Sequence, residues 1–506
     1  MNQLWASREE NLSDLLAGLA EPATPNSGKR VPISTISDDS RCIAKNTLFV
    51  AVPGEKVDGH EFIQQAVSRG AVAVLAERVI PDPGVPVFRA ADVRLALAKL
   101  SARWFGLEKR TADAPQLIGI TGTNGKSTTA YLLRSIFRAA EKTCGMLGTV
   151  EYDLVARRLP ATLTTPSALH LADYIRESAD AGADAIVLEC SSHALAQHRT
   201  AGLSLAAGVF TNLSGDHLDY HETIDSYAAA KARLFEQLSE SSVAIINRDD
   251  AQAQRMAQDC KASVSFCSME DATAEYRIQV KKETIDGAQW ELSLADEKAS
   301  CRTPLFGRHN AYNAMCAAAT AHRLGIGVDA IVAGLEKIEN IPGRLQRVRG
   351  GRDAQIFVDY AHTDDALRNV ARVLKPLTQR RLVVVFGCGG DRDRTKRPRM
   401  AQAAAEFADG VVVTSDNPRT EDAHEIICDI LAGFTPESRK RVMIEPDRRC
   451  AIRAAATTLR PGDVLLIAGK GHEKYQLIGE TMVRFDDVEE AEQAIAAVES
   501  TLSKVG

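Results

Sequence analysis

The sequence lacks the features that would direct it to a membrane, out of the cell or onto nucleic acid. Its 506 residues carry a net charge of only −6, which gives no general electrostatic reason to bind nucleic acid or an anionic membrane. No apolar run approaches the length of about 18 residues that a membrane span requires. Charged residues follow Trp5 closely, so residues 1–10 contain no signal-peptide core. We therefore expect a cytoplasmic protein with no nucleic-acid and no membrane partner.

Paired cysteines are also missing, although the chain contains ten cysteines. They are scattered singly with no C-x-x-C pair, which argues against a zinc site or a disulfide framework and for a reducing cytosol. Cys190 and Cys388 lie beside candidate functional motifs, and we expect both to be small buried apolar residues. The chain has no low-complexity tract and no short internal repeat.

A glycine-rich segment, residues 119–129 (GITGTNGKSTT), is the strongest local motif. It lies between an apolar strand-like run and a helix-like pattern, where backbone N–H groups and a helix N-terminus bind phosphate. Lys126 can reach terminal phosphates, and a hydroxyl of Ser127 or Thr128 can bind magnesium. Ile120 stands where the strict G-x-x-x-x-G-K-[ST] pattern needs glycine, and a simple glycine turn is the alternative. We predict nucleoside triphosphate binding by Gly122, Thr123, Asn124, Gly125, Lys126, Ser127 and Thr128.

The rest of the chain shows the composition and periodicity of a multidomain α/β protein. It is 45% hydrophobic and 25% charged, and its length predicts about three domains. Strand-like runs alternate with helical stretches, which predicts a central, mostly parallel P-loop-type sheet, a Rossmann-like α/β carboxy-terminal domain and a smaller α/β amino-terminal domain. A polar stretch ending at Pro115 and a Pro-Gly break at 342–343 place the boundaries at 1–112, 113–341 and 342–506. The expected strands are 47–52, 71–76, 85–89, 185–188, 208–211, 243–247, 356–358, 382–386, 411–414 and 464–467.

In the central region, residues of types that commonly bind metals follow or end two further predicted strands. Glu189 ends an apolar run, and a carboxylate there suits Mg²⁺, although a structural ion pair is the alternative. His217 lies in the segment 211–221 (TNLSGDHLDYH), which is dense in potential ligands. Zinc is possible in principle, but a second magnesium fits better beside a phosphate loop and without a cysteine partner.

Three strands of the last region run into Gly- or Asp-rich loops at 387–391, 415–419 and 468–473. Ligands of open α/β sheets bind at the carboxyl ends of strands, so these loops predict a second binding edge. Taken alone, the segment 416–419 (DNPR) is an ordinary turn.

Together, the segments 122–128 (GTNGKST), 189–193 (ECSSH) and 216–221 (DHLDYH) resemble the Mur ligase family. These ATP-dependent amide-forming enzymes build the peptide stem of the peptidoglycan precursor. The resemblance continues through 306–313, 343–346 and 358–363 and covers almost the whole chain. It implies an amino-terminal domain for a UDP-sugar, a central ATPase domain and a carboxy-terminal domain for the incoming amino acid.

The resemblance also implies roles for individual residues. Lys126, Glu189, His217 and Lys231 would be catalytic, with Mg²⁺ held by Ser127, Glu189, His217 and Lys231. Lys231 would carry a carbamate formed with CO₂, whereas the sequence alone suggests a solvated helix lysine. ATP would also contact Asn310, Arg344 and Asp359. The UDP-sugar dipeptide would contact Asp38, Ser40, Glu55, Lys56, Val57, Thr164, Thr165, Ser191, Gln197 and Arg199. Leu163 stands where many relatives carry Asn, so the resemblance supplies no side-chain contact there.

Among members of the family, the chain looks most like those that add meso-2,6-diaminopimelate to UDP-N-acetylmuramoyl-L-alanyl-D-glutamate. The amino acid would be bound by Arg392, Asp416, Asn417, Pro418, Arg419, Gly469 and Glu473. The planar fork of Arg419 suits the far carboxylate of diaminopimelate, and Glu473 suits its ammonium. Lysine lacks that carboxylate and would leave Arg419 without its anion. We expect a monomer that uses these two substrates, ATP and Mg²⁺.

Three alternatives remain at this point. A lysine-adding ligase differs at the position of Arg419. A folylpolyglutamate synthase-like enzyme shares the last two domains but lacks the uridine-type amino-terminal region. A non-catalytic nucleotide-binding regulator would release no phosphate in response to the two substrates.

Overall fold

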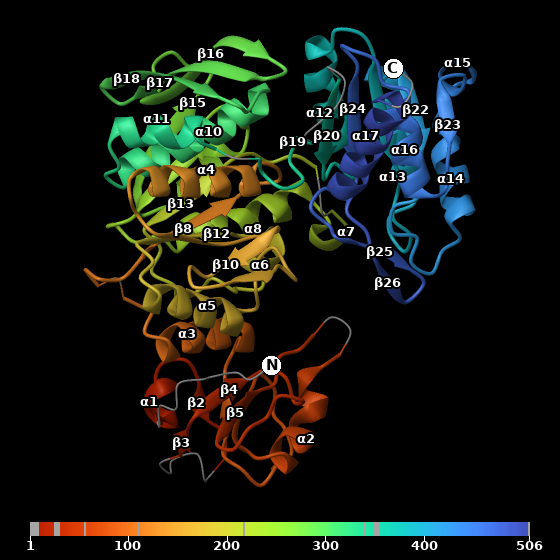
Figure 1. Ribbon diagram of the computed structural model, residues 1–506. Helices are drawn as coiled ribbons and strands as arrows, with labels where there is room; N and C mark the ends of the chain where they lie inside the picture. Colours follow the sequence, from red (N-terminus) through yellow and green to blue (C-terminus); the bar gives the residue numbers. More distant parts are fainter. Residues whose placement is uncertain are drawn as a thin grey trace. The chain divides into compact units, whose positions relative to one another are not determined.

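The computed structural model describes residues 10–24, 31–54, 57–109, 111–215, 218–338, 340–348 and 354–503. It divides into two compact units, the first formed by Met1–Gln279, Trp290–Cys301 and His309–Lys337, and the second by Val280–Gln289, Arg302–Arg308 and Ile338–Gly506. The described residues form sheets of five, eleven and six strands (Figure 1). The predicted α/β class with three domains is confirmed. None of the helices in these ranges is both long and apolar enough to cross a membrane.

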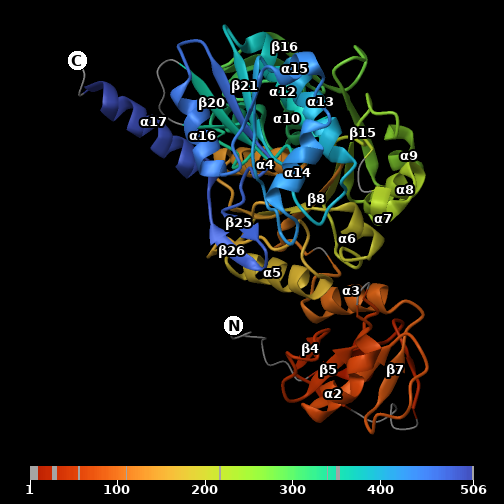
Figure 2. The ribbon, with the colours of Figure 1, turned by 90° about the vertical axis from the view of Figure 1, so that its right-hand side faces the viewer.

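The amino-terminal sheet has the order β2-β7-β6-β5-β4 and is parallel except for β2 (Figure 2). Alternate residues of its strands face opposite layers, as a sheet covered on both sides requires. Leu48 and Leu75 pack with α1 and α3, whereas Phe49 and Val74 pack with α2. The elements are β1 (Glu10–Asn11), α1 (Leu12–Leu15), β2 (Glu21–Pro22), β3 (Pro32–Ile33), β4 (Thr35–Ser37), β5 (Thr47–Val50), a 3₁₀ helix (Gly59–Phe62), α2 (Ile63–Ser68), β6 (Ala71–Ala76), β7 (Val87–Arg89) and α3 (Val93–Trp104).

The central sheet has the order β11-β10-β9-β12-β8-β13-β14-β15-β16-β17-β18. Strands from β9 to β16 in this order run parallel, and β10 and β11 add an antiparallel edge that the sequence did not predict. Its strands are β8 (Gln116–Thr121), β9 (Cys144–Leu147), β10 (Glu151–Asp153), β11 (Arg158–Pro160), β12 (Ala185–Glu189), β13 (Ala207–Phe210), β14 (Val243–Asn247), β15 (Ser263–Ser268), β16 (Tyr276–Thr284), β17 (Gly287–Leu294) and β18 (Glu297–Thr303). Its helices are α4 (Lys126–Ala139), α5 (Ala168–Asp180), α6 (Ser192–Ala196), α7 (Leu218–His221), α8 (Ile224–Glu236), α9 (Ala253–Gln258), α10 (Arg308–Arg323) and α11 (Val328–Glu336).

The order of this sheet explains where the predicted site residues meet. β8 lies between β12 and β13, and all three run in the same direction. The phosphate loop, Glu189 and the segment after β13 therefore leave the sheet at the same edge. This edge is a topological switch point, the usual ligand site of an open α/β sheet.

The carboxy-terminal sheet has the order β19-β20-β24-β21-β22-β23 and is parallel except for β19. Val384 and Leu466 face the layer of α12, α13 and α14, whereas Val385 and Leu465 face α16 and α17, as in a doubly wound fold. The elements are β19 (Gln346–Arg347), β20 (Gln355–Asp359), α12 (Asp364–Leu377), β21 (Leu382–Phe386), α13 (Lys396–Phe407), β22 (Gly410–Val413), α14 (Ala423–Leu431), α15 (Pro436–Arg439), β23 (Val442–Ile444), α16 (Arg448–Thr457), β24 (Val464–Ala468), the hairpin β25 (Tyr475–Ile478) and β26 (Thr481–Arg484), and α17 (Asp487–Ser503).

Candidate active site

The phosphate loop connects β8 to α4 through two glycines with positive φ. Gly122 has a φ of 152° and Gly125 a φ of 88°. A Cβ at Gly122 would collide with the Thr211 hydroxyl, and one at Gly125 with the side-chain amide of Asn313. Only glycine meets both demands, because it lacks a Cβ and tolerates positive φ. Gly125 is also the N-cap of α4 and offers no side chain to its first N–H groups, which leaves them for an anion.

Asn212, which follows β13 and was not predicted from the sequence, holds this loop through hydrogen bonds. Its Oδ1 accepts from the Asn124 N–H at 3.0 Å, and its Nδ2 donates to the Asn124 carbonyl at 3.0 Å. The Thr123 N–H donates to the Asn212 carbonyl at 2.8 Å. Asn212 lies in the segment 211–221, which was noted for its potential metal ligands. Its position in that segment could therefore have identified it as a site residue.

Two lysines converge on one carbonyl of the loop. Lys126 Nζ donates to the carbonyls of Gly122 and Thr123, each at 2.8 Å. Lys231 Nζ donates to the same Gly122 carbonyl at 2.9 Å. The Lys231 side chain is buried, and its Nζ lies 4.5 Å from the centre of the Tyr227 ring. The Tyr227 hydroxyl in turn lies 3.1 Å from Thr123 Oγ1. Lys231 is therefore part of the loop surroundings and not a solvated helix residue.

Glu189 ends β12 as a buried carboxylate beside the first turn of α4. Its Oε2 accepts from Ser127 Oγ at 3.0 Å and from Thr149 Oγ1 at 2.9 Å, and its Oε1 accepts from the Thr149 N–H at 3.0 Å. It forms no ion pair with any residue in the described ranges. A hydroxyl and a carboxylate at a phosphate loop are hard oxygen ligands of the kind that Mg²⁺ prefers.

The described residues that fit Mg²⁺ do not form a cluster of several ligand side chains. Among the residues that the structure describes, no group of three or more His, Cys, Asp or Glu side chains is placed to hold a metal ion. His217 lies outside the described residues, as do Glu55 and Lys56. Mg²⁺ needs only one or two protein ligands because it keeps several waters and binds substrate phosphates, so Ser127 and Glu189 fit it.

The residues predicted to hold the dipeptide form one cluster around Glu189. Thr165 Oγ1 donates to the Glu189 carbonyl at 2.6 Å, and Ser191 donates its N–H to Thr165 Oγ1 at 3.0 Å. Arg199 donates to the Thr165 carbonyl at 2.7 Å and to Gln197 Oε1 at 2.8 Å. The cluster is continuous with the carboxylate, because Thr164 Oγ1 lies 3.1 Å from Thr149 Oγ1.

A cavity of about 790 Å³ lies beside this cluster and brings the described uridine candidates together. Asp38, Ser40 and Val57 line it from the amino-terminal domain, and residues of the central domain including Leu163 and Tyr174 line it from the other side. Burial raises the pKa of the Asp38 carboxyl. The Leu163 backbone is held by the Tyr152 hydroxyl, while its side chain is half exposed and offers only apolar contact.

The other ATP candidates lie on α10, just before β19 and at the end of β20. Asn310 is buried on α10 and accepts from Asn313 Nδ2 at 3.4 Å, and Asn313 adjoins Gly125. In the second unit, Asp359 accepts backbone N–H groups from Leu345 at 2.6 Å and from Ala361 at 2.9 Å. Burial raises the pKa of Asp359, and the charge of Arg344 opposes that shift.

The loops after β21 and β22, in the second unit, carry residues that were predicted to bind the amino acid. Arg419 has a φ of 53°, donates its N–H to the Leu477 carbonyl at 3.0 Å and donates Nη1 to the Gly390 carbonyl at 2.7 Å. Its Nε and Nη2 donate to no other described residue, so two edges of the fork are available to a ligand. Arg392 is exposed on the adjoining loop.

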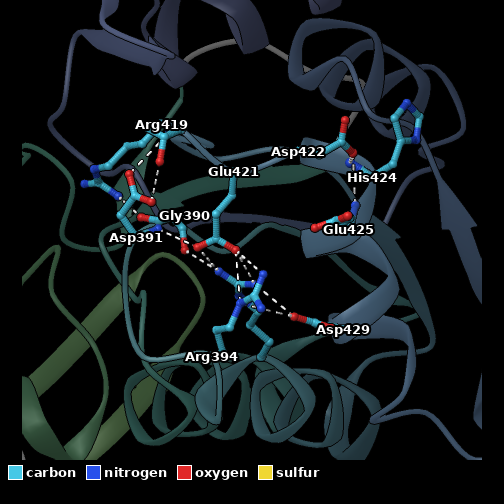
Figure 3. Close-up of polar contacts among 12 residues, drawn as sticks. Gly390, Asp391, Arg394, Arg419, Glu421, Asp422, His424, Glu425 and Asp429 are labelled. Atoms are coloured by element: carbon cyan, nitrogen blue, oxygen red, sulfur yellow. Dashed lines mark hydrogen bonds and ion pairs between the residues drawn. The ribbon is translucent and has the colours of Figure 1, made fainter.

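The carboxylate of Glu421 connects the loop after β21 to the loop after β22 through hydrogen bonds (Figure 3). Glu421 accepts from the Asp391 N–H at 2.6 Å, from Arg394 Nη2 at 2.7 Å and from Arg397 Nη2 at 2.9 Å. The hydrogen bond from the buried Arg397 is the largest of the effects that lower the pKa of Glu421 to about 2. Glu421 therefore stays ionised at neutral pH and keeps the turn at 390–391 against the segment that carries Arg419.

Next to Arg419, three residues of the site bind one another. Asn417 Nδ2 donates to Glu473 Oε2 at 3.0 Å, and Lys470 Nζ contacts both residues. Asp416 and Asn417 are buried in the loop after β22, while Gly469 has a φ of 117° and adjoins the Asp416 carboxylate. Five of the residues here were predicted from the sequence, but Lys470 was not, and neither were Thr149, Asn212 and Tyr227 near the phosphate loop.

Three segments of the chain match models of the Mur ligase family. Residues 32–104 match the Mur ligase family catalytic domain, residues 120–321 the Mur ligase middle domain, and residues 343–471 the Mur ligase glutamate ligase domain.

Two similar curated proteins are both called UDP-N-acetylmuramoyl-L-alanyl-D-glutamate–2,6-diaminopimelate ligase. The protein of Solibacter usitatus (strain Ellin6076) is 41% identical over 482 residues, which are 94% of this chain and 96% of the relative. The protein of Geobacillus kaustophilus (strain HTA426) is 41% identical over 474 residues, 92% of this chain and 96% of the relative.

Solved structures are similar as well. One of a ligase of the same name has a TM-score of 0.70 and 34% identity and covers 97% of this chain and 100% of its own. A folylpolyglutamate synthase of Mycobacterium tuberculosis, complexed with ADP and AMPPCP, has a TM-score of 0.60 over 74% of this chain and 92% of its own. At 22% identity, that second likeness shows a shared fold only.

Proposed function

The chain belongs to the Mur ligase family, and on that premise we propose that it joins meso-2,6-diaminopimelate to UDP-N-acetylmuramoyl-L-alanyl-D-glutamate with ATP. The bond formed is an amide to the γ-carboxylate of the D-glutamyl residue, in cytoplasmic synthesis of the peptidoglycan precursor. The observation that carries the proposal is the 41% identity, over 94% of the chain, to a relative of that activity by name. We further propose a monomer, with the domain boundaries 1–112, 113–341 and 342–506.

The reaction has two steps and needs no nucleophile from the protein. The γ-carboxylate of the D-glutamyl residue attacks the γ-phosphate of ATP and gives an acyl phosphate and ADP. An amine of diaminopimelate then attacks the acyl carbon, and the tetrahedral intermediate expels phosphate. The protein contributes positioning and charge neutralisation, which are the main sources of catalysis in phosphoryl transfer.

We assign the phosphate end of the reaction to the loop between β8 and α4. Lys126 gives up its bonds to the loop carbonyls and contacts the terminal phosphates, while Asn212 keeps the loop in shape. Asn310, Arg344 and Asp359 are further ATP contacts. Ser127, Glu189, His217 and carbamylated Lys231 would hold Mg²⁺, which when bound neutralises charge on the phosphate oxygens.

The surroundings of Lys231 support the carbamate. The ammonium first releases a proton, and the neutral amine then attacks CO₂ and releases a second proton, so that a cation becomes an anion with two oxygens. In the unmodified chain two ammonium groups share the Gly122 carbonyl, and like charges this close repel each other. Carbamylation removes the repulsion and supplies an anionic group that would serve as a ligand for Mg²⁺ at the phosphate loop.

Thr149 connects the two substrate sites in this proposal. Its hydroxyl donates to Glu189 Oε2 and lies against the hydroxyl of Thr164, which we assign to the dipeptide together with Thr165, Ser191, Gln197 and Arg199. Asp38, Ser40, Glu55, Lys56 and Val57 are assigned to the UDP part.

Replacing Thr149 by Val is expected to lower kcat about 10- to 150-fold. Valine keeps the shape of the side chain and the N–H bond to Oε1 but removes one hydrogen bond to a charged acceptor, a loss of about 1.5–3 kcal/mol. Thr149→Ser keeps the hydroxyl and should retain most activity. Steady-state kinetics of phosphate release check this, and equal activity of the Val and Ser variants would contradict it.

In the proposed amino-acid site, each carboxylate of diaminopimelate needs a cation and each unreacted ammonium needs an anion at a fixed position. Arg419 binds the far carboxylate and Glu473 the far ammonium, and Asp416, Asn417, Pro418 and Gly469 shape the site around them. Arg392 binds the carboxylate at the reacting end. A forked guanidinium contact to a carboxylate is directional, which makes Arg419 the specificity residue.

An amino-acid panel tests the function directly. The purified protein is given ATP, Mg²⁺ and the UDP-muramoyl dipeptide with meso-diaminopimelate, L-lysine, L-ornithine or L-glutamate, and phosphate and product mass are measured. We expect product with diaminopimelate and at least about 100-fold less with lysine, because lysine leaves Arg419 unpaired. Equal use of lysine would overturn the amino-acid assignment. Phosphate release that does not depend on the UDP-muramoyl dipeptide would overturn the proposed function.

A further inference from the structure

Lys470 is a fully buried lysine to which the reaction above assigns no role. It follows β24, and its side chain has no exposed surface. Its Nζ donates to Asn417 Oδ1 at 2.9 Å and to Glu473 Oε2 at 3.0 Å. The Asp416 carboxylate lies 4.0 Å away. A charge is retained inside a protein only when its partners are arranged around it, so these contacts explain why Lys470 can be buried.

The contacts of Lys470 fix two residues that we assign to diaminopimelate. Asn417 Oδ1 accepts from Lys470 and from the Leu477 N–H, so its Nδ2 must point the other way, toward Glu473 Oε2. Glu473 Oε2 thus accepts from both Lys470 and Asn417. Its Oε1 accepts no hydrogen bond from the part of the chain that the structure describes. One carboxylate oxygen is therefore anchored and the other is presented to a ligand.

Lys470 also determines the net charge of this side of the site. Asp416 and Glu473 contribute two negative charges, and Lys470 reduces them to one. Arg448 does not change this balance, because Asp487 neutralises it in a buried pair at 2.7 Å. Arg419 adds one positive charge on the neighbouring segment. One net negative and one positive charge match the zwitterionic far end of diaminopimelate, whereas two net negative charges would favour the lone ammonium of lysine.

We infer that Lys470 is a positioning residue that selects diaminopimelate over lysine by anchoring Glu473 and Asn417 and by cancelling one of the two acidic charges. This inference rests on the proposed function, because it concerns the far end of the same amino acid. Lys470 acts through Glu473 and does not itself touch the substrate.

The first test replaces Lys470 by Met, which keeps the length of the side chain and removes its charge. We expect kcat/KM for diaminopimelate to fall about 30-fold, mainly through KM, because Glu473 loses its anchor. For lysine we expect a fall of no more than about threefold, so the preference for diaminopimelate falls about tenfold. KM for ATP should stay within about twofold. The matched control is Lys440→Met, which removes an exposed lysine from an ion pair with Glu437 and should leave the preference unchanged.

A double-mutant cycle separates this role from general destabilisation. If Lys470 acts through Glu473, adding Lys470→Met to Glu473→Gln should change kcat/KM for diaminopimelate by less than about threefold. Independent effects, which multiply in the double variant, would overturn the inference. The double variant carries neither the lysine nor the charged carboxylate, so it supplies the test even if Lys470→Met alone does not fold. Thermal unfolding and circular dichroism report folding for every variant.

The outcomes distinguish this inference from the proposed function. If the unmodified protein does not use diaminopimelate, the proposed function fails. If it does, and folded Lys470→Met keeps the original preference over lysine, only the role of Lys470 is overturned. A uniform loss of kcat with every amino acid would also overturn it, because that loss indicates damage to the fold and not a change in selection.

Discussion

Lys231→Ala is expected to lower kcat about a thousandfold, to a level that short carboxylic acids partly restore. The variant loses the anionic oxygens that we propose beside the phosphate loop, and removing one preorganised electrostatic group costs about 10²–10³ in rate. Formate or acetate can enter the space left by the side chain and supply a carboxylate there. Phosphate release measured over a range of added acid checks both the loss and the recovery.

Two controls accompany the Lys231 variant. Lys142→Ala removes an exposed lysine of the same domain and should leave the rate unchanged. The unmodified enzyme should lose activity in CO₂-depleted buffer and regain it when bicarbonate is added, because a carbamate forms reversibly from the amine. Full activity of Lys231→Ala in CO₂-depleted buffer would contradict the carbamate proposal.

Arg419→Ala is expected to reduce kcat/KM for diaminopimelate about a thousandfold and to leave KM for ATP within about threefold. The variant leaves the far carboxylate without its forked partner, and sites built to pair a polar group lose about 10⁴–10⁵ when the partner is missing altogether. The loss should be smaller here, because Glu473 still holds the far ammonium. The amino-acid panel with product mass as the readout measures the effect.

The backbone at position 419 makes Arg419→Lys a well-matched control. Its φ of 53° is equally unfavourable for Arg, Lys and Ala, so the three proteins should differ little in backbone strain. Lysine keeps the charge but not the planar fork, and we expect it to recover no more than about tenfold. If Arg419→Ala lowered the use of diaminopimelate and lysine by the same factor, the specificity assignment would be wrong.

Much of the fold could be predicted from the sequence because its signals are local. The bounds of β6, β14 and β21 are those expected from apolar runs, and the other expected strands differ by one or two residues at their ends. The strands β9, β15, β16, β17 and β18 were not predicted. The antiparallel edge strands β10 and β11 were also missed, because they are only three residues long and β11 is mostly exposed. Such short segments carry too little hydrophobic periodicity to be recognised.

The site residues can likewise be separated into those that a local sequence motif predicts and those that it does not. Lys126 and Glu189 stand in recognisable motifs at strand ends, and the family resemblance added Lys231 and Arg419. Thr149 and Lys470 could not be selected in this way, because threonine and lysine are common at protein surfaces and nothing in their own sequence context marks them. Their importance depends on the carboxylates that they contact, Glu189 and Glu473.

By itself, the sequence determined the α/β class, the phosphate loop at the strand-to-helix junction and the family. These properties follow from apolar periodicity and from motifs of a few adjacent residues. Only the tertiary structure decided which side chains share a partner: Ser127 meets Glu189 across 62 positions, Lys231 reaches Gly122 across 109, and Lys470 reaches Asn417 across 53. The physical reason is that parallel strands bring their carboxyl ends to one edge of a sheet, where burial forces polar groups from distant segments to pair with one another.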